Sequence, residues 1–162
     1  MRPLLAALAT CCTLLAASGT SLGQEGPEGT EILPATEESA HLPPGVVEYD
    51  YGTPFPTSGV HAAVPTDPGF FSVPQPLSQL VHALEHGNIV IYYDAPGEEV
   101  VSRLLGLANE HVGEPHGIVV VPSAGIGEQI ALTAWERRLI LPRYEEDQAR
   151  AFIAAFLGRV GH

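Results

Sequence analysis

The chain has 162 residues, enough for one domain of ordinary size. Its 19 acidic residues outnumber its 7 basic ones, which are all arginine, and the formal net charge at pH 7 is −12. A charge of this sign repels nucleic-acid phosphates and attracts cations, so we expect no nucleic-acid partner.

Residues 1–23 have the layout of a secretory signal peptide. Arg2 precedes a short run of Leu, Ala and Thr, small residues follow, and no acidic residue occurs before Glu25. The apolar run is shorter than a membrane span requires. We therefore expect an exported protein, periplasmic or extracellular, which is tethered to the membrane only if the leader is retained as an anchor.

Sulfur-containing residues occur only in this leader. Cys11, Cys12 and the only methionine, Met1, all lie within it. A metal site in the remaining chain must therefore use nitrogen and oxygen ligands, a donor set that suits Zn(II) or Cu(II).

Residues 24–44 are rich in Glu, Pro, Gly and Thr and contain no basic residue, which predicts an acidic, disordered tether. The folded domain is expected over residues 45–162. A short strand is predicted over residues 46–51. The stretch 52–69 repeats Pro and Gly every few residues, so it cannot form a helix or a central strand, and we expect an ordered loop.

Strands and helices mix in the rest of the chain. Pro76 and Gly87 are typical of the start and the end of a helix. Alternation and amphipathic spacing then predict strands over residues 88–94, 117–124, 129–135 and 139–142, and helices over 98–113 and 144–158. This order predicts an α+β domain with a small mixed sheet and about three helices packed on it, preceded by the Pro-rich loop.

The sequence LVHALEHG, residues 80–87, places two histidines one helical turn apart. His82 and His86 lie almost opposite the apolar stripe of this helix, so they face water or a covering segment. The Pro-rich loop with His61 is the obvious cover. The stripe consists of Leu77, Leu80, Val81 and Leu84.

Two imidazoles at this spacing can reach one metal ion. We predict a divalent transition-metal site, for Cu(II) or Zn(II), that consists of His61, His82, Glu85 and His86. Glu85 is either a ligand or the group that orients an imidazole. The other histidines are expected to be solvated: His41, His111, His116 and His162.

Two other functions stay open. In one, the protein is a structural or interaction domain with a protein partner at the cell envelope, and its histidines only lock the loop over the helix. In the other, the H-x-x-E-H pattern belongs to a zinc metallohydrolase. Such peptidases use a long helix and a distant acidic ligand, whereas here a strand follows His86 at once. The distant acids Glu145 and Glu146 fall in the first turn of the last helix. We therefore predict no catalytic residue and no organic cofactor.

Four segments together resemble an uncharacterised bacterial family, domain of unknown function 3105. They are PFPTSGVH (54–61), LVHALEHGNIVIYYD (80–94), ALTAWERRL (131–139) and the terminal AFIAAFL helix. The resemblance covers roughly residues 46–158. It implies export or membrane anchoring, and it implies that His61, His82, Glu85 and His86 form one constellation, but it names no ligand. Family members usually have a small residue after the Trp, where this chain has Glu136.

Overall fold

A computed structural model of the chain describes residues 26–35 and 40–161. The predicted signal peptide, residues 1–23, lies outside the described residues. Within them, no helix has the length and apolar character that spanning a membrane requires.

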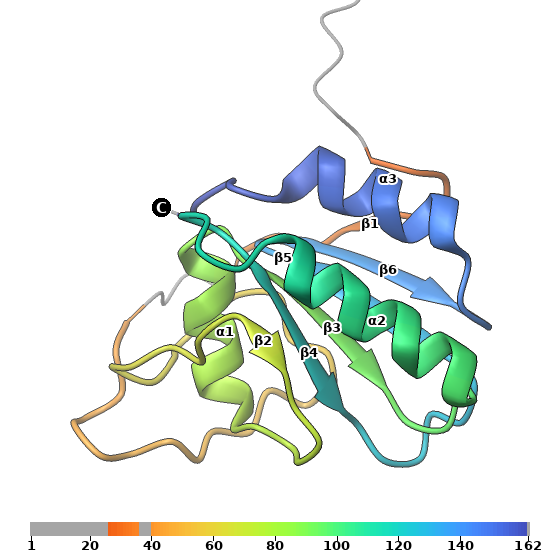
Figure 1. The fold of residues 1–162 in the computed structure, drawn as a ribbon. Helices are drawn as coiled ribbons and strands as arrows, with labels where there is room; N and C mark the ends of the chain where they lie inside the picture. The colour runs from red at the N-terminus through yellow and green to blue at the C-terminus, as the bar shows by residue number, and fades with distance from the viewer. Residues whose placement is uncertain (1–25, 36–39, 162) are drawn as a thin grey trace, which may run out of the picture.

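Six strands form one mixed sheet in the order β1-β6-β5-β3-β4-β2 (Figure 1). Strand β3 lies inside the sheet, parallel to β4 and antiparallel to β5. β5 and β6 form an antiparallel hairpin, while β2 runs parallel to β4. The strands are β1 (Glu31–Ile32), β2 (Gly69–Phe70), β3 (Ile89–Tyr93), β4 (Ile118–Pro122), β5 (Ile130–Ala134) and β6 (Arg137–Leu141).

Three helices cover the two faces of this sheet: α1 (Leu77–Glu85), α2 (Glu98–Glu110) and α3 (Glu146–Phe156). Successive strand residues point to opposite faces. Val90 and Tyr92 therefore pack with the apolar side of α1, and Ile89 and Ile91 pack with α2 and α3. The predicted α+β class is confirmed, with the Pro-rich loop ahead of α1.

The strand predicted over residues 46–51 is wrong. These residues have no strand partner and are mostly exposed. The Asp50 carboxylate accepts a hydrogen bond from the Gly52 backbone N–H at 2.8 Å, which turns the chain here. The rings of Tyr49 and Tyr51 contact each other, with centroids 4.8 Å apart.

The region predicted as a disordered tether contributes to the fold where the structure describes it. Glu31–Ile32 forms strand β1, which pairs antiparallel with β6 and is an edge strand of the sheet. The Glu31 carboxylate accepts two hydrogen bonds from the Arg138 guanidinium, at 2.6 and 2.9 Å. Farther along, His41 forms a parallel bridge with His61. These described segments are therefore ordered parts of the fold, not a disordered tether.

The hairpin between β5 and β6 turns at Glu136. Its φ is +59°, and among the described residues it is the one non-glycine residue with a positive φ. This backbone conformation favours glycine, the residue that the family pattern usually has here. The Glu136 N–H donates to the Thr57 carbonyl at 3.0 Å, and its own carbonyl accepts from the Leu33 N–H at 3.0 Å. The tight turn therefore forms with glutamate in place.

Candidate metal centre

Helix α1 carries three of the four predicted ligands near its C-terminal end. The helix begins after Pro76, and the chain leaves it at Gly87, whose φ of +83° ends the helix in the left-handed region. His82 lies opposite the apolar stripe, yet it is only 5% exposed. A segment therefore covers this face of the helix, which is one of the two alternatives that the amphipathic pattern left open.

The covering segment is the Pro-rich loop together with the chain around residue 41. The Ala62 N–H donates to the Ser78 carbonyl at 3.2 Å, which joins the loop to α1. The His61 N–H donates to the Ala40 carbonyl at 3.0 Å, and the Leu42 N–H donates to the His61 carbonyl at 2.7 Å. These bonds bring His61 over the helix, where it is 1% exposed.

Hydrogen bonds to backbone carbonyls fix which ring nitrogen carries the proton in the two buried histidines. His61 Nδ1 lies 2.8 Å from the Gly59 carbonyl oxygen, and His82 Nδ1 lies 2.7 Å from that of Ala62. A carbonyl only accepts, so both Nδ1 atoms donate. In the neutral rings, both Nε2 atoms then present a lone pair, the form in which imidazole binds a metal.

The Nε2 atoms point toward other donors of the predicted set. His61 Nε2 lies 3.2 Å from Glu85 Oε2, and His82 Nε2 lies 3.0 Å from His86 Nε2. Ligand atoms bound about 2.0–2.1 Å from one ion lie about 2.9–3.4 Å from each other in square or tetrahedral arrangements. Both pairs therefore have the spacing of neighbouring ligands on one ion.

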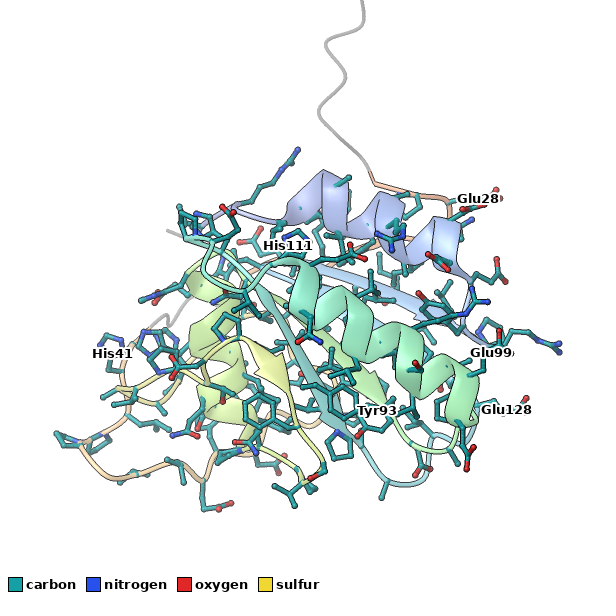
Figure 2. The ribbon with its side chains drawn as sticks, in the orientation of Figure 1. Glu28, His41, Tyr93, Glu99, His111 and Glu128 are labelled. Atoms are coloured by element: carbon teal, nitrogen blue, oxygen red, sulfur yellow. The ribbon has the colours of Figure 1, made fainter. Side chains whose placement is uncertain are left out.

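The structure adds a ligand candidate that sequence reasoning missed. Ligand atoms of His41, His61, His82 and Glu85 all lie within 4.8 Å of one another. The His41 ring centroid is 4.8 Å from that of His61 and 5.0 Å from that of His82. Figure 2 shows His41 at the side of the molecule that carries α1. His41 was expected to be solvated. The residue is exposed, but its ring contacts those of His61 and His82.

These five residues, His41, His61, His82, Glu85 and His86, are called the histidine cluster below. His86 is not one of the four residues whose ligand atoms lie within 4.8 Å of one another; it joins the cluster through the hydrogen bond between its Nε2 and His82 Nε2, and it is exposed at the end of α1. No local sequence signal marks His41, because its place depends on the bridge to His61.

Burial keeps the central imidazole neutral. Desolvation lowers the pKa of His82 below its ordinary value, although the hydrogen bond to the Ala62 carbonyl partly opposes this. The nearby rings of His61, His86 and His41 lower the pKa further, in that order of importance. A neutral ring at physiological pH is ready to bind a metal without first losing a proton.

A cleft of about 610 Å³ opens beside the cluster. Glu85 and His86 belong both to its wall and to the cluster, so the cluster is buried on the His61 side and accessible on the other. An ion, or a substrate of a metal centre, requires such access. Other wall residues include Asp67, Asn88, Glu114, His116 and Val160.

The remaining sequence candidates lie elsewhere. Figure 2 shows His111 at the C-terminal end of α2. His162 lies outside the described residues. Glu146 forms ion pairs with Arg103 at 2.7 Å and Arg150 at 2.9 Å, so its carboxylate serves a surface network at the start of α3. His116 was expected to be solvated, but its Nδ1 donates to the His86 carbonyl at 2.9 Å.

Comparison with known proteins places the chain in a family. No curated protein and no solved structure matches it. A family model described as protein of unknown function (DUF3105) matches residues 45–161. The matched range contains His61, His82, Glu85 and His86, whereas His41 precedes it. It also agrees with the resemblance found in the sequence motifs. The chain therefore belongs to the DUF3105 family of proteins of unknown function.

Proposed function

We propose that this protein binds one divalent transition-metal ion, Cu(II) or Zn(II), in the histidine cluster. One observation carries the proposal. His61 Nε2 is buried, has no hydrogen-bond partner among the described residues and lies 3.2 Å from Glu85 Oε2. With the ring proton on Nδ1 alone, a lone pair faces a carboxylate oxygen, which is unfavourable unless a positive charge, either a metal ion or a second ring proton, lies between them. A metal ion converts both atoms into ligands.

The donor types support the choice of metals. Imidazole nitrogens with one carboxylate suit Zn(II) and Cu(II), and the general affinity order favours copper. Zn(II) commonly takes four ligands in a tetrahedron. The cluster offers five side chains, so with zinc one of them stays outside the coordination sphere. The exposed positions of His41 and His86 make these two the exchangeable ligands, around a centre of His61, His82 and Glu85.

A second candidate function is structural, and a specific observation favours it. The Nδ1 bonds from His61 to Gly59 and from His82 to Ala62 link the loop to itself and to α1. Each such buried bond contributes about 1 kcal/mol to the free energy of unfolding. In this function the histidines hold the loop in place, and the protein acts as an interaction domain without a metal.

Elemental analysis separates the two functions. The protein is purified without a histidine tag and incubated with Cu(II) or Zn(II), beside a His82→Ala, His86→Ala double variant. The metal proposal expects about one ion per chain in the parent and none in a folded double variant. If the parent and the variant retain equal amounts of metal after dialysis, or neither retains any, the cluster is not a metal site.

We also propose that the protein acts outside the cytoplasm, either free or in contact with an envelope protein. The basic, apolar and small-residue order of residues 1–23 supports export. Fractionation of cells that express the chain with and without these residues tests it. Recovery of both forms in the cytoplasm would contradict export.

A further inference from the structure

We propose that His116 is a positioning residue that holds the metal ligands Glu85 and His86 in place, together with the C-terminal segment 158–161. This inference rests on the proposed metal binding. It assigns a role to a side chain outside the cluster and to a stretch of chain far from it in sequence.

The physical problem lies at the end of α1. The last carbonyls of a helix have no intrahelical donor, so they need partners from elsewhere. Here each of three consecutive carbonyls accepts a hydrogen bond from another part of the chain. The Glu85 carbonyl accepts from the Gly161 N–H at 2.8 Å, that of His86 from His116 Nδ1 at 2.9 Å, and that of Gly87 from the Gly158 N–H at 2.8 Å. The backbone of both ligand residues is therefore held from outside the helix.

The supporting segments pack closely on their neighbours. A Cβ on Gly161 would lie 2.4 Å from the Trp135 ring, so the tail packs directly on that side chain. A Cβ on Gly87 would lie 3.0 Å from the Gly158 carbonyl carbon. The tail is thus fixed between the β5–β6 hairpin and the end of α1.

His116 is the one side chain among these three donors. Because a carbonyl only accepts, its Nδ1 carries the proton, and the ring packs closely on Gly158. The ring also lines the cleft beside Glu85 and His86. It therefore fixes the position of the His86 backbone on the side of the cluster that faces the cleft.

This support affects metal affinity through distance. The Nε2 atoms of His82 and His86 lie 3.0 Å apart, a hydrogen-bond distance that also falls within the range for neighbouring ligands on one ion. A ligand must stay within about 0.5 Å of its productive position to contribute fully. Without the His116 donor, we expect the His86 carbonyl to turn toward water in the cleft. The His86 ring then moves away from the ion. Loss of a hydrogen bond to a ligand's own side chain typically weakens metal binding by about 10- to 100-fold, and because the His116 bond reaches the backbone of His86 we expect the lower end of this range.

The test compares His116→Ala with His116→Asn. The asparagine amide nitrogen lies near the position of Nδ1, so it retains the donor to His86. The dissociation constant for Zn(II) is measured by competition with a chromophoric chelator, and the electron paramagnetic resonance spectrum of bound Cu(II) reports ligand geometry. His111→Ala, which removes a histidine from the nearby end of α2, is the matched control.

We expect affinity at least about tenfold weaker and an altered Cu(II) spectrum in His116→Ala. His116→Asn and His111→Ala should stay close to the parent in both measurements. If the alanine variant does not fold, His116→Gln replaces it, because its longer side chain moves the amide away from the Nδ1 position. A folded alanine or glutamine variant with parental affinity and spectrum overturns the positioning role, as does an asparagine variant as weak as the alanine one. A parent that binds neither metal refutes the proposed function itself.

Discussion

Replacement of His82 by asparagine separates the two functions that this side chain can serve. The asparagine amide nitrogen takes the place of Nδ1, which donates to the Ala62 carbonyl at 2.7 Å. The ligand atom Nε2, 3.0 Å from His86 Nε2, is removed. The variant thus keeps the loop bond and loses the metal donor.

The expected magnitudes differ clearly between the two functions. Without metal, the retained hydrogen bond preserves about 1 kcal/mol, and the smaller side chain costs about 1–2 kcal/mol through the space that it leaves. With metal at one hundred times its dissociation constant, the parent gains about 2.7 kcal/mol. For a domain of this size that gain raises Tm by about 10 °C. An affinity loss of about 100-fold leaves the variant only about 0.4 kcal/mol at the same metal concentration, a rise of about 1–2 °C.

Thermal unfolding followed by circular dichroism, with and without Zn(II), measures these shifts. His82→Gln is the complementary control, because it places an amide near Nε2 and loses the Ala62 bond. It should be the less stable of the two variants without metal. A His82→Asn protein that keeps a metal-induced rise of about 10 °C would refute our assignment of His82 as a ligand. Tm values that do not respond to Zn(II) in either the parent or the variant would favour the structural function.

Four further outcomes follow from the geometry. Because burial lowers the pKa of His82 in the folded state, the unfolded chain binds more protons below about pH 6.5, so the free energy of unfolding should fall from pH 7 to 5 in urea titrations, and less so in His82→Asn. Glu85→Gln should weaken Zn(II) binding about 10- to 100-fold in chelator competition while Tm without metal stays near parental, and an unchanged affinity would remove Glu85 from the centre. A Cβ on Gly117 would lie 2.5 Å from the Pro68 ring, so Gly117→Ala should cost about 1–3 kcal/mol in denaturant unfolding, whereas the control Gly106→Ala, in open space within α2, should stabilise by up to about 1 kcal/mol. Glu136→Gly should be neutral or stabilising by about 1 kcal/mol, since it relieves the positive φ at the β5–β6 turn, and a lower Tm would show that the glutamate side chain contributes more than the strain costs.

Local patterns were sufficient to predict the three helices and the strands β3, β4, β5 and β6. Strand β3 consists of five buried apolar residues between turn signals, and α1 has its stripe and its ends marked by Pro76 and Gly87. The spacing of His82 and His86 is also local, so the sequence could predict that both rings share one face of the helix.

Features that depend on pairing across the chain could not be predicted in this way. His41 reaches the cluster through a bridge to His61, and β1 forms because the edge of β6 accepts it. Neither contact has a sequence period. The opposite error at residues 46–51 has the same origin, since alternating Val and Tyr form a strand only where a neighbouring strand offers hydrogen bonds.

Because the bridge places His41 and His61 side by side, a metal ion bound by both rings would cross-link two distant parts of the chain. An ion bound by both rings closes a loop of about twenty residues, a size at which a disulfide restricts the unfolded chain by about 3 kcal/mol. Beyond Cys12 the chain has no cysteine with which to form such a bond. Unlike a disulfide, this link would resist thiol reductants and open with chelators or acid, so the attachment at His41, in contrast to the β1–β6 pairing, would follow metal supply.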